Sequence, residues 1–341
     1  MKNRNYGIDI LKIISCLMVV GLHVFTVKSW TFNLNDILKS YVYYLGTLAI
    51  PIFFMINGFF MLNKGKTVSY KYIKKKEWFF LRIVLLAIII LAIPFSLKNH
   101  QNYFETVYFI FLSSLQFKVN NSGILMHFWF FWSLILILLG VPLFYKLLHR
   151  KCKIYTLLLL VLFIFNICLD VANHFQRVPY DQYVPQFLRM NLWVFYYFIG
   201  GIIGYNFDSF SRIINSHKKK WVVCTIFFVL LVGLYGVTNR YLFGFKWAEW
   251  NYENVLTVVS SILLFGISTL SDKFNKKNVE KIVSLTLGVY IIHPFIFKLI
   301  KPFIPENGVF IYYLLAYLVT VIVSFLLVYI IRKNEWVKRL I

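Results

Sequence analysis

The chain has 341 residues, of which 60% are hydrophobic, 20% are aromatic and 14% are charged, and its formal net charge is +23. A soluble domain carries about 25% charged residues, so this composition excludes an ordinary soluble protein and indicates a membrane protein. The positive charge does not indicate a nucleic-acid-binding protein, because the basic residues lie in short clusters between apolar segments and not across a soluble fold.

Ten apolar segments, each of about 17 to 24 residues, are long enough to cross a bilayer as helices. We predict spans at residues 8–27, 42–62, 79–97, 125–147, 154–171, 190–207, 221–238, 253–270, 283–300 and 308–331. The loops between them are too short for a separate soluble domain, so residues 1–341 are predicted to form a single all-α, polytopic membrane domain. No small-residue cleavage site follows the first span, which is therefore expected to remain as a helix.

The distribution of positive charge predicts the topology. With the N-terminus placed in the cytoplasm, 24 lysines and arginines fall on the cytoplasmic side and 10 fall in the outer loops, while Lys12 and Arg82 lie within spans. The positive-inside rule therefore orients both termini to the cytoplasm. Residues 103–119 are apolar but contain Glu105 and other polar residues, which favours a short interfacial or re-entrant helix, or an ordinary helix in an outer loop.

The first span holds two ionisable side chains, Lys12 and His23. An ionisable group in hydrocarbon costs roughly 2.5 to 3.5 kcal/mol, so such groups usually face a protein interior or a wet cavity. Eleven helical residues make about three turns, so both side chains project from one face and lie about 16 Å apart along the axis. One stripe of this helix is therefore predicted to line a polar space, although Lys12 can also snorkel to the inner interface.

Histidines carry the best signal for chemistry within the spans. His127 opens the fourth span and His293 lies in the ninth, and imidazole is the usual general acid or base at neutral pH. These two and His23 are far apart in sequence and no carboxylate accompanies them, so no metal site is predicted. Carboxylates lie only at span ends, as at Asp170 and Glu253, which disfavours a proton-coupled transporter. The four cysteines form no C-x-x-C pair, so no disulfide framework is indicated.

Four motifs occur in order along the chain. Lys12 precedes His23 by ten intervening residues, Pro51 to Phe60 read Pro-Ile-Phe-Phe-Met-Ile-Asn-Gly-Phe-Phe, His127 begins His-Phe-Trp-Phe-Phe, and Leu287 to Pro294 read Leu-Gly-Val-Tyr-Ile-Ile-His-Pro. In this combination the chain, from Asp9 to the last span, resembles the acyltransferase-3 family. Members of that family are membrane enzymes that transfer acyl groups, commonly acetyl from acetyl-CoA, to cell-surface carbohydrate.

The resemblance implies a binding site for acyl-CoA near the cytoplasmic face. Its predicted residues are Lys12, Asn57, Gly58 and Arg82, which come to a similar depth on the first three spans. Gly58 allows close approach of the backbone, whereas Arg82 can also snorkel to the interface. Two residues depart from the family pattern. Lys12 stands where arginine is commoner, which loses the bidentate fork, and Asn57 stands where serine is commoner, which removes any serine role.

The resemblance also implies catalytic and acceptor-binding residues. His23 is predicted to act as general base on the acceptor hydroxyl or to be acylated itself as a relay, and His293 is the second catalytic candidate. His127, Trp129 and Tyr290 are the predicted acceptor site, because flat aromatic faces suit sugar rings. Other interpretations stay open, since Trp129 and its neighbours also suit an interfacial belt, and either His23 or His293 also suits a structural hydrogen bond.

We therefore predict a multi-pass cell-membrane O-acetyltransferase that moves an acyl group from cytoplasmic acyl-CoA to a hydroxyl of an extracytoplasmic or lipid-linked glycan. Acetyl-CoA is the expected donor, no metal is expected, and the expected partners are the carbohydrate and membrane lipids, not nucleic acid. A transporter or flippase of a glycan or lipid intermediate is the alternative, and a sensor or scaffold without catalysis is a third class. Four properties stay open at this point: the identity of the glycan, the hydroxyl that is acylated, whether the donor carries an acetyl or a succinyl group, and the oligomeric state.

Overall fold

The protein is described by a computed structural model at residues 5–26, 32–65, 68–117, 123, 125–176, 179–270, 276–305 and 309–335. Within these residues the chain forms helices joined by short turns and holds no β-strand, so the predicted all-α class is confirmed. The α-helices are α1 Tyr6–Val24, α2 Leu34–Leu45, α3 Ala49–Leu62, α4 Tyr70–Asn99, α5 Tyr103–Ser114, α6 Trp129–Arg150, α7 Cys152–His174, α8 Met190–Tyr205, α9 Phe207–Ser216, α10 Lys218–Thr238, α11 Val255–Ile267, α12 Lys276–Val283, α13 Thr286–Ile300 and α14 Phe310–Ile331.

Eight helical segments in this part of the chain are long and apolar enough to cross a membrane. They are Tyr6–Val24, Leu34–Leu62, Tyr70–Leu97, Met126–Arg150, Cys152–His174, Lys218–Phe243, Thr286–Phe303 and Phe310–Ile331. The two remaining predicted spans correspond to α8 and α11, which are apolar but have only 16 and 13 residues. At about 1.5 Å per residue these two helices are shorter than the hydrocarbon core.

The second span begins earlier than the sequence predicts. Lys39, expected in an outer loop, lies in α2, where its ammonium is 2.8 Å from the carboxylate of Asp36 and 4.8 Å from the ring centre of Tyr313. Hydropathy alone ends the apolar run at Lys39 because it counts the charge and takes no account of the Asp36 carboxylate that pairs with it. Residues 103–119 do contain a short helix, α5, capped by the side chain of Asn102.

Nine of the basic residues that predicted the topology lie outside the described residues. They are Lys2, Arg4, Lys28, Lys66, Lys118, Arg177, Lys273, Lys338 and Arg339.

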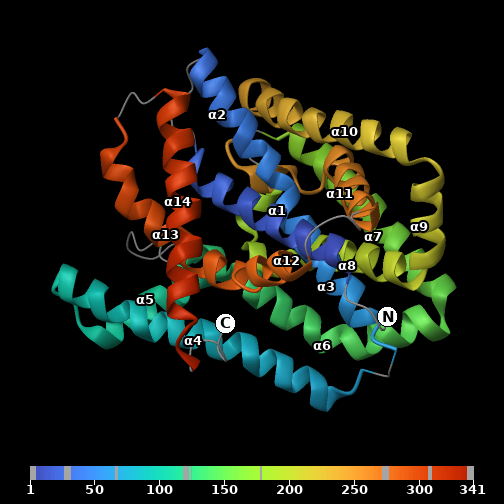
Figure 1. The fold of residues 1–341 in the computed structure, drawn as a ribbon, viewed down its shortest axis with the longest axis horizontal. Coiled ribbons are helices and arrows are strands. Elements are labelled where there is room, and N and C mark those ends of the chain that lie inside the picture. The colour runs from blue at the N-terminus through green and yellow to red at the C-terminus, as the bar shows by residue number, and fades with distance from the viewer. Residues whose placement is uncertain are drawn as a thin grey trace.

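Helix α1 runs through the middle of the molecule, with α4 and α10 along opposite edges and α13 and α14 at one end (Figure 1). It begins at Asn5, whose side chain accepts from the backbone N–H of Ile8, and it packs against α3, α12 and α13. The last turn of α1 therefore ends inside the helical bundle, and that turn carries His23.

Helices α3 and α8 cross at two glycines in the core. A Cβ on Gly58 would lie 1.9 Å from the carbonyl oxygen of Tyr197, and a Cβ on Gly200 would lie 1.8 Å from that of Met55. Only glycine fits at such distances, so the two backbones are in direct contact. This crossing fixes α3 against α8. The segment just before α8, residues 182–186, lines a cavity.

Candidate functional site

Lys12 lies in the second turn of α1 and His23 lies in its last turn, and the two side chains have different surroundings. The Lys12 ammonium lies 3.5 Å from a carboxylate oxygen of the buried Asp9 and 4.9 Å from the ring centre of Phe60. His23 instead faces two other imidazoles. The polar stripe predicted for this helix therefore contains a paired cation at one end and a histidine cluster at the other.

Three histidines from distant parts of the sequence meet at the end of α1. The ring centre of His23 is 4.9 Å from that of His293 on α13 and 5.9 Å from that of His127, which lies in the short helix η2 (Met126–Phe128). His127 and His293 are 5.8 Å apart. Tyr290, one turn before His293, donates its hydroxyl hydrogen bond to the carbonyl of His127 and so ties η2 to α13.

Two of these imidazoles keep a ring nitrogen without a partner. Nδ1 of His293 lies 2.9 Å from the carbonyl oxygen of Val289, which can only accept, so Nδ1 carries the proton. The neutral ring then has its lone pair on Nε2, which is buried and has no hydrogen-bond partner. Nε2 of His127 is likewise buried without a partner. A lone pair held in this way suits a general base or a nucleophile.

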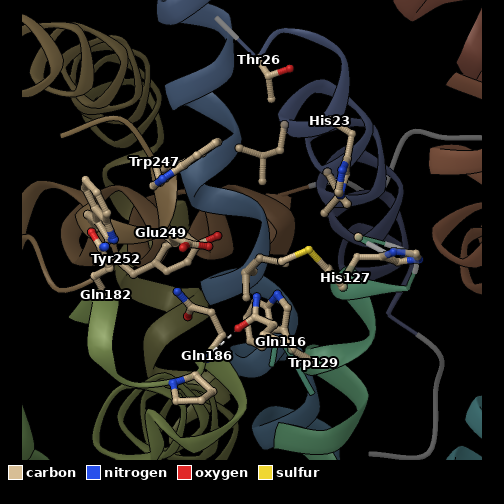
Figure 2. A pocket seen from close by; sticks show the side chains of 18 of the residues that line it. His23, Thr26, Gln116, His127, Trp129, Gln182, Gln186, Trp247, Glu249 and Tyr252 are labelled. Carbon is tan, nitrogen blue, oxygen red and sulfur yellow. Dashed lines mark hydrogen bonds between the residues drawn. The ribbon is translucent and has the colours of Figure 1, made fainter. Parts of the chain in front are cut away.

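A cavity of about 890 Å³ opens beside the cluster. His23, His127, Trp129 and Tyr290 all line it, and so do the segments around residues 116–117, 182–186 and 247–252. Figure 2 shows His23 and His127 on one side of the cavity, and Trp247 and Glu249 on the other. Trp129 is only 7% exposed because it packs against Trp193, with ring centres 4.9 Å apart.

The wall opposite the histidines rests on a buried ion pair that the sequence did not reveal. Arg189 pairs with Glu253, and its guanidinium also donates to the backbone carbonyl of Glu249 at 2.9 Å. The hydroxyl of Tyr196 donates to the carbonyl of Tyr252 at 2.6 Å. Burial, together with the nearby Glu249 carboxylate, holds the pKa of Tyr252 well above its ordinary value, so its hydroxyl stays neutral.

The residues predicted for the donor do not line this cavity. Asn57 donates to the carbonyl of Phe53 at 2.8 Å, and the close backbone approach at Gly58 is made to Tyr197 of α8. Arg82 is half-buried on α4, and its Nε has no hydrogen-bond partner. Of the four, Arg82 is the residue with a buried side-chain nitrogen that has no hydrogen-bond partner.

The described residues include no group of three or more His, Cys, Asp or Glu side chains arranged to hold a metal ion. The fold is that of a multi-pass, all-helical membrane protein, and its three clustered histidines lie beside a cavity. The sequence profile of an acyltransferase domain matches residues 5–329. The chain therefore belongs to the acyltransferase-3 family, which confirms the resemblance that its motifs carry and supports acyl transfer in general.

Curated relatives are similar at low identity. The chain is 24% identical over 352 aligned positions to an Enterococcus faecalis protein named amino-acid racemase, covering 96% of this chain and 46% of the relative. It thus spans about half the length of that relative. It is 20% identical over 311 positions to a protein of Staphylococcus aureus (strain MRSA252) named probable poly-beta-1,6-N-acetyl-D-glucosamine export protein, covering 87% and 83% of the two chains. No solved structure matches the chain.

Proposed function

We propose that this protein is a cell-membrane O-acetyltransferase that moves an acetyl group from cytoplasmic acetyl-CoA to a hydroxyl of an extracytoplasmic or lipid-linked glycan. The observation that carries the proposal is the meeting of His23, His127 and His293 beside a cavity in a chain of an acyltransferase family. The names of the staphylococcal relatives favour a polysaccharide as the acceptor.

The proposed topology has ten spans, counting the short helices α8 and α11, and both termini in the cytoplasm. The cavity supports this arrangement because its walls come from three connections, which contribute residues 116–117, 123 and 126–127, residues around 182–186, and residues around 247–252. The charge pattern assigns all three connections to the outer side. The last turn of α1 also ends at this side. The acceptor is then bound from outside, and the donor arrives from the end of α1 that carries Lys12.

In the proposed reaction a histidine Nε2 removes the proton from the acceptor hydroxyl. The oxygen attacks the thioester carbonyl, the carbon–sulfur bond breaks, and the CoA thiolate leaves and takes up a proton. His23, at the junction of α1 and the cavity, is the proposed base or, in a relay, the nucleophile that carries the acyl group. His293 is the proposed second base, while Lys12, Asn57, Gly58 and Arg82 are proposed to form or support the donor site, and His127, Trp129 and Tyr290 the acceptor site.

Glycan export without acyl transfer is the second candidate, favoured by the name of the staphylococcal relatives. Oriented membrane vesicles distinguish the two functions. Radiolabelled acetyl-CoA supplied only at the cytoplasmic face is expected to label a glycan present only at the opposite face. Glycan flux that consumes no acetyl-CoA would instead support export. An ester formed on a cytoplasmic acceptor, or transfer from donor supplied outside, would contradict the proposed topology.

A further inference from the structure

The charges that border the cavity differ from those of the rest of the chain. The chain holds 36 lysines and arginines against 13 aspartates and glutamates, for a formal net charge of +23. Within the described residues, the cavity lining contains neither a lysine nor an arginine, and its one carboxylate is that of Glu249. Arg240 and Lys246, the basic residues nearest to Glu249 in sequence, do not line the cavity. The cavity of this strongly basic protein is thus lined by a negative charge.

The segment that carries Glu249 is fixed by hydrogen bonds to α2 and to the start of α8. The backbone N–H of Ala248 donates to the hydroxyl of Tyr43 at 3.1 Å, and the carbonyl of Glu249 accepts from the guanidinium of Arg189 at 2.9 Å. Arg189 is 2% exposed and pairs with Glu253, so its charge is balanced within the wall. The Glu249 carboxylate is therefore carried by a fixed backbone, next to an ion pair that adds no net charge.

The negative potential of Glu249 extends along the side of the cavity opposite the histidines. Figure 2 shows Glu249 and Trp247 on that side, across from His23 and His127. Besides burial, the Glu249 carboxylate raises the pKa of the Tyr252 hydroxyl, which also lines the cavity. The face of an aromatic ring such as that of Trp247 attracts cations as well. A ligand that reaches the histidines therefore lies between them and a wall that favours positive over negative charge.

We propose that Glu249 selects the acceptor by charge, so that the cavity binds a sugar that is uncharged or cationic and excludes one that carries a carboxylate or a phosphate. In a cavity of about 890 Å³ a charge on the ligand stays within roughly 10 Å of the Glu249 carboxylate, where their interaction changes the affinity by about tenfold. Walls of low dielectric strengthen such an interaction. This inference rests on the proposed function, because it concerns the acceptor of the same site.

Burial alone would produce a different selectivity. A charged group of either sign loses hydration when it enters an apolar cavity, so desolvation weakens the binding of cations and anions alike. The field of Glu249 instead weakens the binding of anions and strengthens the binding of cations. An affinity order of cation, neutral ligand and anion therefore reports the carboxylate, whereas tightest binding of the neutral ligand reports desolvation.

Three methyl β-D-glucosides that differ only at C6 measure this order. They are the cationic methyl 6-amino-6-deoxy-β-D-glucopyranoside, the neutral methyl β-D-glucopyranoside and the anionic methyl β-D-glucopyranosiduronate. Each is titrated into purified protein in nanodiscs of uncharged lipid at about pH 8, where imidazole is neutral and a primary amine is still protonated. Binding is followed by saturation-transfer NMR. The cationic probe is expected to bind about a hundredfold more tightly than the anionic probe, because each sign of charge contributes about tenfold.

Variants at two glutamates assign the effect. Glu249→Gln keeps the size of the side chain and removes its charge, so the ratio between the cationic and anionic probes should fall to about fivefold or less. Glu249→Asp keeps the charge and should keep the affinity order. Glu105→Gln is the matched control and should retain the full ratio, because Glu105 is exposed in the first turn of α5 and does not line the cavity. If Glu249→Gln does not fold, the affinity order on the unmodified protein still decides.

Equal binding of the three probes, tightest binding of the neutral probe, or no binding of any probe would overturn the selection by Glu249. A ratio that survives unchanged in Glu249→Gln would overturn it as well. These results would leave acyl transfer standing if the oriented vesicles still label the glycan. The expected affinity order in a protein that transfers no acetyl group would instead refute the proposed function alone.

Discussion

The polar side chains near the two ends of α1 differ in whether they have hydrogen-bonding or ion-pair partners. Toward the N-terminal end of α1, which is the inner end in the proposed topology, Lys12 has the Asp9 carboxylate and the Phe60 ring as partners, and the hydroxyl of Tyr6 donates to Glu280. At the C-terminal end of α1, which is the outer end in the proposed topology, His23 lies beside two imidazoles that each keep an unpartnered nitrogen. Buried polar groups that pair with one another stabilise the fold, whereas orphaned ones cost stability and remain available to a substrate. This difference is the reason why we propose that the chemistry takes place at the end of α1 that carries His23.

The largest effect is expected at the outer end. His23→Ala should leave an inserted, folded protein whose acetyl transfer is lower by about 10² to 10⁴, because the base or nucleophile is removed. Transfer is measured in membranes at matched protein levels. His217→Ala is the control, since His217 is exposed at the C-terminal end of α9 and does not line the cavity. Near-normal turnover of His23→Ala would show that the histidine cluster is structural.

The scaffold between the two ends is tested at the glycine crossing. Gly58→Ala places a methyl group 1.9 Å from the carbonyl oxygen of Tyr197, so α3 and α8 must separate, and we expect a loss of about 1 to 3 kcal/mol in stability. Thermal unfolding in detergent should show a lower midpoint. Gly21→Ala is the matched control, because its Cβ meets no atom closer than 3.9 Å. An unchanged midpoint for Gly58→Ala would mean that the crossing is looser than described.

The inner end separates a donor role from a structural one. If the charge of Lys12 serves the donor, Lys12→Met should raise the KM for acetyl-CoA by about tenfold, and Lys12→Arg should retain activity. If Lys12 serves only Asp9, Lys12→Met should lower the amount of folded protein with no change in KM. Adding Asp9→Asn to Lys12→Met should then restore the protein level, because the buried carboxylate no longer needs a cation.

The smallest effect is expected at the hydrogen bond that ties η2 to α13. Tyr290→Phe removes the donor to the His127 carbonyl, a bond of about 1 kcal/mol, so kcat should fall by roughly fivefold without loss of the fold. Tyr44→Phe is the matched control, because it removes an equivalent hydroxyl bond to the carbonyl of Phe245. Equal effects of both variants would indicate a general loss of stability and not a displaced His127.

The sequence by itself predicted the all-helical membrane class, the family and the short helix at residues 103–119. These follow from apolar length, periodicity and ordered motifs, which are local properties of the chain. It also selected His23, His127 and His293 as the residues for chemistry, because ionisable groups within apolar segments are costly. It missed the start of α2 at Leu34, since the pairing of Lys39 with Asp36 is invisible to hydropathy.

Only the tertiary structure brought the three histidines together, because α1, η2 and α13 are separated by more than a hundred residues each and their meeting depends on helix packing. The same holds for the cavity wall, where Arg189 and Glu253 pair across 64 residues and Gln116 meets Gln186 across 70. Glutamines in connecting segments have no local pattern that marks them. Which of their hydrogen-bonding atoms the fold leaves without partners is decided only when every element is in place.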